Sequence, residues 1–456
     1  MKKRGIWLFA VLLLTVLLIC GCEKKGNRPG ITLAPQELYH LPALPDKYTE
    51  LNQQLSEILS GGAEYAAPVS GSNLQPVQMQ DLDGDGQEEA LAFFRNSADE
   101  KPLKIYIFTM KDETYQRAAL IEGSGTAIHS VVYSDLDGDG RIELAVGWRT
   151  SPDLLALSVY NLPPEGPREV VRTNYVRYSM LDMNRDDRKE LVVLRSDEEG
   201  SGVADYYGWT EDKLTLQSSA RISMTMAQLR QQGRVTRGTL RSGETALFLT
   251  GVETAAETAP QAVFDVLIVK NGDLMNAVLA DATGVSAEIA PFCSLYPTDL
   301  IAAGCTAVPW PIGSGSDDGE PSHQFVEWRS YDDRGRARTE LCTYHNVEDG
   351  WYLSIPANWQ GQVQATRSVL PDEAGVTFSV NRGGESKPFL RITAITGSNR
   401  MAKAARGNRF SLSRQVDTMY VAELLEANRT WRGGVTEDEV RAAFSLIKPE
   451  WSAGDN

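Results

Sequence analysis

Three similar segments of this sequence carry acidic side chains at a regular spacing, which is the chemistry of oxygen ligands for a cation. They begin at Asp81, Asp135 and Asp182 and read DLDGDGQEE, DLDGDGRIE and DMNRDDRKE. Each has an oxygen-bearing side chain at its first, third, fifth and ninth positions. Calcium takes six to eight oxygens at about 2.3–2.6 Å, and a tight loop can also offer the backbone carbonyl of its seventh position. The segments therefore predict three calcium-binding loops.

The predicted ligands are the side chains at these four positions. They are Asp81, Asp83, Asp85 and Glu89; Asp135, Asp137, Asp139 and Glu143; and Asp182, Asn184, Asp186 and Glu190. Glycine at the sixth position of the first two segments permits the positive φ of a sharp turn. Asp187 takes that position in the third, where Asp is tolerated better than most residues. Arg185 and Lys189 dilute the charge of the third segment, and a solvated turn without metal is the alternative for all three.

The flanking sequence excludes an EF-hand. That motif needs a bidentate Glu at its twelfth position and a helix on each side, whereas the twelfth residue here is Ala92, Val146 or Val193. Each segment instead leads into a short apolar run, ALAFF, LAVGW or LVVL. Such runs, rich in β-branched or aromatic residues, indicate buried strands. We therefore expect each loop to close at its ninth position, with Glu89, Glu143 or Glu190, and to lead directly into a strand.

The acidic segments belong to a longer repeat. Their first residues are separated by 54 positions (Asp81 to Asp135) and 47 positions (Asp135 to Asp182), periods typical of propeller blades or solenoid units. GTLRSGETALFL from Gly238 and TDLIAAGCTAVPW from Thr298 fall one and two periods later, without the acids. We interpret both as blades without metal. Alternating runs such as LKIYIFTM, LALSVYNL, VADYYGWT, AVFDVLIVKNG and HQFVEWRSYDD predict the remaining strands.

The pattern DxDGDGxxE before an apolar strand resembles the FG-GAP or VCBS repeat, which is similar to the blades of integrin-type β-propellers. The resemblance implies four-stranded blades whose acidic loops hold calcium for stability rather than for catalysis, and it carries the ligand role onto the twelve residues named above. The family often has Asp at the ninth position, where this sequence has Glu. We expect a mainly β fold, with a β-propeller of about five to seven blades over residues 63–346.

The N-terminus has the layout of a secretory signal. Three basic residues precede an apolar run from Ile6 to Ile19, which is too short for a stable membrane anchor. The run ends in Ile19-Cys20-Gly21-Cys22, which resembles a bacterial lipobox. We expect a lipoprotein signal peptide over residues 1–21 and lipid on Cys22; a plain secreted protein or an uncleaved anchor is the alternative. Residues 22–62 then form a polar tether and a helix that ends at Gly61.

Charge and cysteine content limit the possible partners. The formal net charge of the 456 residues is −16, which makes nucleic acid an unsuitable partner because phosphate binding needs a basic surface. Beyond the signal only Cys293, Cys305 and Cys342 remain. Cys293 and Cys305 could close a short disulfide loop, or the thiols could be free and buried.

The C-terminal segment, residues 347–456, predicts a small α+β domain. Its strands are indicated by GWYLSIPANWQGQV, AGVTFSV and PFLRITAIT. Thr436 with Glu439 forms a capping box for a closing helix, in which Val440, Phe444 and Ile447 share one face and which Pro449 ends. The segment faintly resembles single-sheet domains of the PsbP and Mog1 type. Exposed aromatics could line a carbohydrate or peptide groove, but most of the candidates are expected in the core; they are Trp148, Trp209, Trp310, Trp328, Trp351 and Trp359.

Catalytic motifs are not evident in this sequence. The four histidines, His40, His129, His323 and His345, do not pair at a zinc-ligand spacing. We therefore expect a non-enzymatic lipoprotein on the extracytoplasmic side of a bacterial membrane, binding protein or glycan through a calcium-stabilised propeller. The alternatives are a cell-envelope hydrolase that uses paired carboxylates and a structural spacer.

Overall fold

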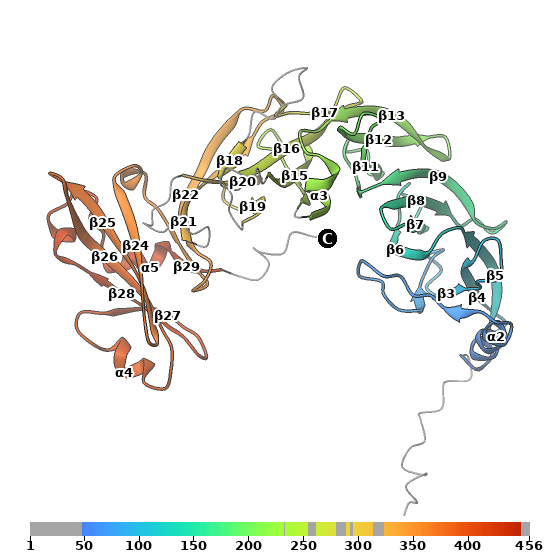
Figure 1. The fold of residues 1–456 in the computed structure, drawn as a ribbon, viewed down its shortest axis with the longest axis horizontal. Helices are drawn as coiled ribbons and strands as arrows, with labels where there is room; N and C mark the ends of the chain where they lie inside the picture. Colours follow the sequence, from blue (N-terminus) through green and yellow to red (C-terminus); the bar gives the residue numbers. More distant parts are fainter. Residues whose placement is uncertain are drawn as a thin grey trace, which may run out of the picture. The chain divides into compact units, whose positions relative to one another are not determined.

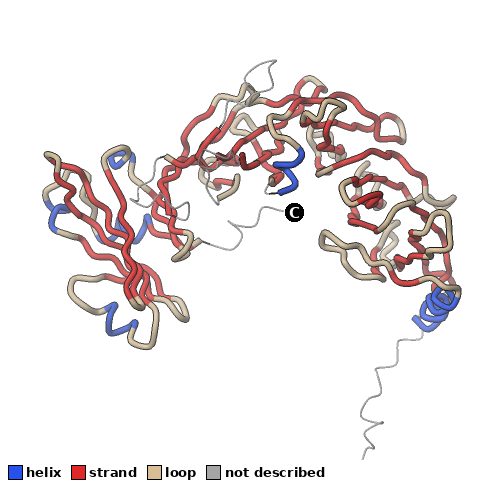
Figure 2. The backbone as a smooth tube through the Cα atoms, in the orientation of Figure 1, coloured by secondary structure: helices blue, strands red, loops and turns tan. Residues whose placement is uncertain are grey.

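The fold is mainly β, as predicted, and consists of antiparallel sheets (Figures 1 and 2). The computed structural model describes residues 48–231, 233–253, 261–279, 289–291, 295–312 and 323–447. The predicted signal peptide, most of the tether and the lipidation residue Cys22 lie outside these ranges. Within them, no helix is both long enough and apolar enough to cross a bilayer.

The first three sheets hold the acidic segments. The first contains β1 (Glu64–Tyr65), β2 (Val77–Gln80), β3 (Glu89–Arg95), β4 (Leu103–Lys111) and β5 (Thr114–Gly123). The second contains β6 (Ala127–Ser134), β7 (Glu143–Ser151), β8 (Leu154–Asn161) and β9 (Arg168–Tyr175), and the third β10 (Arg177–Leu181), β11 (Glu190–Ser196), β12 (Gly202–Thr210) and β13 (Lys213–Arg221). Successive strands pair as in a propeller blade. Helix α2 (Thr49–Ser60) precedes the first sheet and buries Leu51 and Leu55.

Two further sheets follow at the predicted positions. The fourth contains β14 (Arg234–Thr239), β15 (Thr245–Glu253), β16 (Gln261–Lys270), β17 (Asp273–Asn276) and β18 (Ile289–Pro291), after helix α3 (Met226–Gln231). The fifth contains β19 (Thr298–Leu300), β20 (Cys305–Pro311), β21 (His323–Tyr331), β22 (Ala337–Asn346), β23 (Trp351–Ser354) and β29 (Phe444–Leu446). Its last two strands come from the segment after residue 346, so this sheet continues beyond the expected domain boundary.

The sixth sheet and four short helices form the rest of the C-terminal segment. The sheet contains β24 (Val363–Leu370), β25 (Glu373–Arg382), β26 (Glu385–Ile395), β27 (Phe410–Arg414) and β28 (Met419–Leu424). The helices are η2 (Ala357–Trp359), α4 (Arg400–Ala404), η3 (Glu426–Arg429) and α5 (Glu437–Ala443). The predicted capping box of Thr436 and Glu439 is present at the start of α5. The prediction that this helix continues to Ile447 is wrong, because α5 ends at Ala443 and Phe444–Leu446 form β29, which pairs with β23.

Successive sheets share their hydrophobic cores. One apolar cluster lies between the first and second sheets, another between the second and third, and the series continues to the sixth. In β7, Leu144 and Trp148 enter the first of these clusters and Ala145 enters the next. Alternate residues of a strand point to opposite faces, so an inner strand covered on both faces needs a continuous apolar run. This explains why ALAFF, LAVGW and LVVL lack polar residues.

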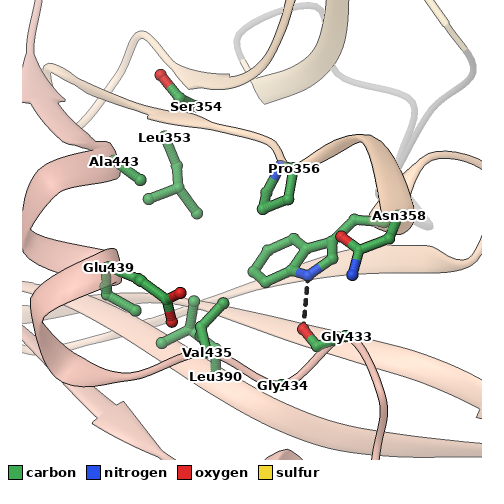
Figure 3. Close-up of a pocket in the computed structure, with 12 residues that line it drawn as sticks. Leu353, Ser354, Pro356, Asn358, Leu390, Gly433, Gly434, Val435, Glu439 and Ala443 are labelled. Atoms are coloured by element: carbon green, nitrogen blue, oxygen red, sulfur yellow. Dashed lines mark hydrogen bonds between the residues drawn. The ribbon is translucent and has the colours of Figure 1, made fainter.

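The predicted burial of most tryptophans is confirmed: Trp148, Trp328, Trp351 and Trp359 are each at most 2% exposed, while Trp209 and Trp310 are partly buried. Trp359 forms one wall of a cavity of about 170 Å³ in the C-terminal segment, where its indole N–H donates to the carbonyl of Gly433 (2.7 Å; Figure 3). The other walls include Leu353 and Leu390. Glu439 also lines this cavity, but its carboxylate accepts hydrogen bonds within the α5 cap.

Candidate metal centres

Each acidic segment forms a loop between two consecutive strands of its sheet. The loops join β2 to β3, β6 to β7 and β10 to β11. Their ninth residues, Glu89, Glu143 and Glu190, begin the inner strands and pair with the last residue of the preceding strand. These three side chains are at most 4% exposed. The loop therefore closes on a buried carboxylate at the edge of the core.

Backbone amides fix the first carboxylate of every loop in the same way. Asp81 accepts the amides of Gly84 (2.8 Å) and Gly86 (3.0 Å). The same pattern is repeated by Asp135 with its fourth and sixth positions, at 2.7 and 3.1 Å. Asp182 repeats it again at 2.5 and 3.0 Å. The third and fifth side chains accept amides two residues later along the chain. These hydrogen bonds order the carboxylate oxygens of each loop.

The fourth and sixth positions of every loop have a left-handed backbone. In the first loop Gly84 and Gly86 have φ of 76° and 85°. In the third, Arg185 and Asp187 both have φ of 67°. The predicted positive φ at the sixth position is therefore confirmed. The positive φ at the fourth position is an additional feature that the prediction did not include. A non-glycine residue in this region costs about 1–2 kcal/mol, so the third loop is held against local strain.

Three acidic oxygens gather within 4.8 Å of one another in each loop. The groups are Asp81, Asp83 and Asp85; Asp135, Asp137 and Glu143; and Asp182, Asp186 and Glu190. Nine of the twelve predicted ligands are thus brought together. Glu89 and Asp139 belong to the same loops but lie outside these groups, and Asn184 donates a hydrogen bond to Asp186 (3.0 Å).

The ninth-position carboxylates are in an unfavourable environment for a negative charge. Burial, reinforced by the neighbouring aspartates, raises the pKa of Glu89, Glu143 and Glu190 from 4.5 to about 7. A backbone amide opposes this rise in each case, that of Leu82 for Glu89. Burial also raises the pKa of Asp137. A divalent cation would offset this concentration of negative charge.

The second loop contains an oxygen that lacks a partner. Glu143 Oε2 accepts the amide of Leu136 (2.8 Å), while its Oε1 is buried and has no hydrogen-bond partner among the described residues. Buried polar atoms are normally paired, so this oxygen fits a metal ligand. Because the donors of all three loops are oxygens, they suit a hard cation such as calcium. In each loop, the three carboxylates that lie together would hold the ion.

Successive loops are hydrogen-bonded to one another. The amide of Ile142 donates to the carbonyl of Leu82 (2.9 Å), and the amide of Lys189 donates to the carbonyl of Leu136 (2.7 Å). Leu82 and Leu136 are also the residues whose amides bind the ninth-position glutamates of their own loops. A β-carbon on Gly84 would lie 2.9 Å from the carbonyl oxygen of Gly140 in the next loop. These contacts between loops could not be predicted from the amino-acid sequence.

The fourth and fifth sheets have a turn where the first three have an acidic loop. Residues 240–244 join β14 to β15, and residues 301–304 join β19 to β20. Gly243 and Gly304 have positive φ in these turns. The predicted strand after each glycine is confirmed. Both turns are shorter than the acidic loops and contain no cluster of carboxylates. Cys305 and Cys342 are buried free thiols, and Cys293 lies outside the described residues.

Comparison with known proteins supports the repeat. The family model described as FG-GAP-like repeat matches residues 81–146, which include the first two acidic loops. No match was found among curated proteins. Two solved structures align with the chain at low similarity. The exotype rhamnogalacturonan lyase YesX has 10% identity and a TM-score of 0.29, covering 71% of this chain and 73% of its own. A protein from Lactobacillus plantarum has 9% identity and a TM-score of 0.27, covering 71% and 85%. Residues 81–146 of this chain are therefore similar to an FG-GAP-like repeat.

Proposed function

We propose that the chain is a membrane-anchored extracytoplasmic lipoprotein whose calcium-stabilised β-propeller module binds or displays a protein or glycan. The observation that carries the calcium assignment is the repetition of one carboxylate–amide geometry in three successive loops. The unpartnered Oε1 of Glu143 supports it independently. The metal has a structural role, because the loops connect strands and contact one another.

The anchoring part of the proposal rests on the N-terminal sequence. Basic residues, a short apolar run and Ile19-Cys20-Gly21-Cys22 form the order that directs export and lipid attachment. The following EKKGNRPGITLAPQE is rich in polar residues, Gly and Pro, which suits a spacer between a membrane and a folded body.

A cavity beside the first loop supports a binding role. It has a volume of about 330 Å³ and lies between the first two sheets. Asp83 and Asp85 line one side, Arg141 from the second loop lines another, and Ile107 and Leu162 contribute apolar surface. The Nε of Arg141 is buried without a hydrogen-bond partner among the described residues. This lining suits a ligand that has both charged and apolar groups.

A chelation experiment tests the calcium assignment. Thermal unfolding is measured in calcium and in a calcium chelator; calcium that binds only the folded state must raise the melting temperature. Asp135→Asn should reduce the calcium-induced rise. The matched control is Asp197→Asn, because Asp197 also accepts two backbone amides, at 3.0 and 2.7 Å, but lies outside the acidic loops. An unchanged melting temperature on chelation of the wild-type protein would overturn the assignment.

A second experiment tests the anchor. The full chain is expressed in a bacterium, and its membrane fraction is assayed after labelling with a radioactive fatty acid. Cys22→Ser should abolish labelling and release of the signal peptide, whereas Cys20→Ser should leave both unchanged. Equal labelling of the two variants would contradict the assignment of Cys22.

A further inference from the structure

The segment from Arg400 to Arg414 is the most basic part of an acidic chain. It reads RMAKAARGNRFSLSR, with five basic residues and no acidic residue, in a protein of formal net charge −16. It comprises α4, the connection to β27 and β27 itself. A local excess of positive charge in such a protein indicates a surface for an anionic partner.

The fold brings this segment together with two strand turns. The guanidinium of Arg400 donates to the carbonyls of Gly397 (3.0 Å) and Val416 (2.7 Å), which ties α4 to the β27–β28 turn. Lys403 donates to the carbonyl of Pro371 (3.3 Å), which ties α4 to the β24–β25 turn. We call residues 369–373, 397–409 and 414–417 the basic tip; α4 marks its place beside the sixth sheet (Figure 1).

Four large apolar side chains of the basic tip are exposed. Val369 and Leu370 precede the β24–β25 turn, at 63% and 65% exposure. Met401 on α4 is 51% exposed, and Val416 in the β27–β28 turn is 84% exposed. They come from three different parts of the chain, so their exposure is a common property of this end of the sheet.

The arginines of the basic tip are only partly neutralised. Arg409 pairs with Glu373 (2.9 Å), and Lys403 lies 3.5 Å from Asp372. Arg406 and Arg414 are exposed and have no ion pair among the described residues. Arg400 contacts carbonyl oxygens rather than carboxylates. Asp372 and Asp417 are the exposed acidic residues of the basic tip, so positive charge is in excess.

We propose that the basic tip docks on an anionic lipid surface, with its exposed apolar side chains in the interface and its arginines at the lipid phosphates. Clustered basic residues are attracted to anionic leaflets, and apolar side chains beside them add to binding. Separate apolar residues on projecting turns suit a fluid lipid interface, which needs no complementary pocket. This inference rests on the proposed lipid anchor at Cys22, because the anchor would hold the acidic body near the membrane.

A site-specific fluorescence experiment tests the docking. Full-length lipidated protein is reconstituted in vesicles of phosphatidylcholine alone or mixed with phosphatidylglycerol, with an environment-sensitive dye on Val416→Cys. The matched control carries the dye on Ile301→Cys, because Ile301 is 98% exposed in the β19–β20 turn. Labelled unsubstituted protein gives the background. Dye at position 416 should shift to the blue and be quenched by brominated lipid in anionic vesicles, while dye at position 301 should not respond.

The charge dependence provides a second readout. Arg406→Gln and Arg414→Gln should each lower the docking equilibrium constant about fivefold, and high salt should reverse the blue shift. Circular dichroism checks that the variants are folded. Equal signals at positions 416 and 301, or no dependence on anionic lipid, would overturn the proposal. A blue shift produced equally by soluble polyglutamate would also overturn it, in favour of an acidic protein partner.

Failure of the anchor is measured separately by vesicle flotation. If flotation shows no anchoring, the dye experiment is repeated with the same protein added to concentrated anionic vesicles. A response at position 416 then supports the docking surface without the anchor, and the lack of a response overturns it.

Discussion

Replacement of Glu143 by glutamine should change stability in opposite directions with and without calcium. Glu143 is 1% exposed, its Oε2 accepts the Leu136 amide, and its Oε1 has no hydrogen-bond partner among the described residues. Glutamine keeps an acceptor for that amide but removes the charge and one metal ligand. Without calcium the buried charge lowers the stability of the folded state, whereas with calcium bound the carboxylate would serve as a metal ligand.

The magnitude follows from the pKa of this carboxyl. Burial raises the pKa from 4.5 to about 7, so the folded state binds the proton more tightly than the unfolded state. The resulting stability is complete below pH 4.5 and is lost as the pH rises through 7. At pH 8 ionisation costs the calcium-free protein about 3 kcal/mol. Glutamine removes this cost, but its own buried side-chain N–H lacks a partner, which offsets the gain by about 1 kcal/mol. Glu143→Gln should therefore stabilise the calcium-free protein by about 2 kcal/mol.

Calcium should reverse the order of the two proteins. At a free calcium concentration 100-fold above Kd, one site adds about 2.7 kcal/mol to the wild type, and the variant loses most of this gain at the second loop. The wild type should then be the more stable protein, by a margin that grows with calcium. Urea unfolding at pH 8, followed by tryptophan fluorescence in calcium and in chelator, measures both differences.

The control for this prediction is Asp265→Asn. Asp265 is also fully buried and accepts hydrogen bonds from Ser223 and Asn276, but it lies on β16, away from the acidic loops. Its substitution should have the same effect in both conditions. If Glu143→Gln destabilises the protein equally with and without calcium, the carboxylate has only a structural role and the metal-ligand reasoning is wrong.

Three further substitutions test the packing of the fold. Gly84→Ala should destabilise the protein more than Gly86→Ala. Both glycines have positive φ, where a side chain costs about 1–2 kcal/mol, but only a β-carbon at position 84 would meet the Gly140 carbonyl oxygen, at 2.9 Å. Equal urea midpoints of the two variants would contradict the contact between the loops. His345 is buried, and desolvation lowers its pKa to about 3. The free energy of unfolding should therefore fall by about 1.4 kcal/mol for each pH unit below 6.5. His345→Gln should remove this dependence in acid titrations followed by circular dichroism. Thr436→Ala should cost about 1 kcal/mol through loss of the α5 cap, and a urea midpoint equal to that of Thr436→Ser would argue against the cap.

The acidic loops and inner strands could be predicted because their determinants are local. Ligand spacing is set within nine residues, and the run after Glu89 or Glu143 is continuous because both faces of the strand are buried. The left-handed backbone at the sixth position was likewise readable from glycine in the first two loops. At the fourth position, Arg185 in the third loop concealed the same conformation, since nothing about arginine signals a positive φ.

Contacts between distant segments could not be read from the sequence. β29 joins the fifth sheet by pairing with β23, although Phe444 and Leu353 are 91 residues apart. Neither strand has a sequence pattern that identifies its partner strand, because three or four residues are too few to define a pairing register. The basic tip was also missed: Met401 and Val416 look like ordinary apolar residues until the fold shows that both are exposed.

The hydrogen bonds between loops suggest why acidic segments occur in consecutive sheets. Glu89 holds the amide of Leu82, whose carbonyl accepts the amide of Ile142, the residue before Glu143. Glu143 in turn holds Leu136, whose carbonyl accepts the amide of Lys189. An ion bound to one of these glutamates would therefore also restrain the backbone of the next loop. The fourth and fifth sheets connect their first strands by short turns with fewer backbone groups to order, so they can form without this restraint.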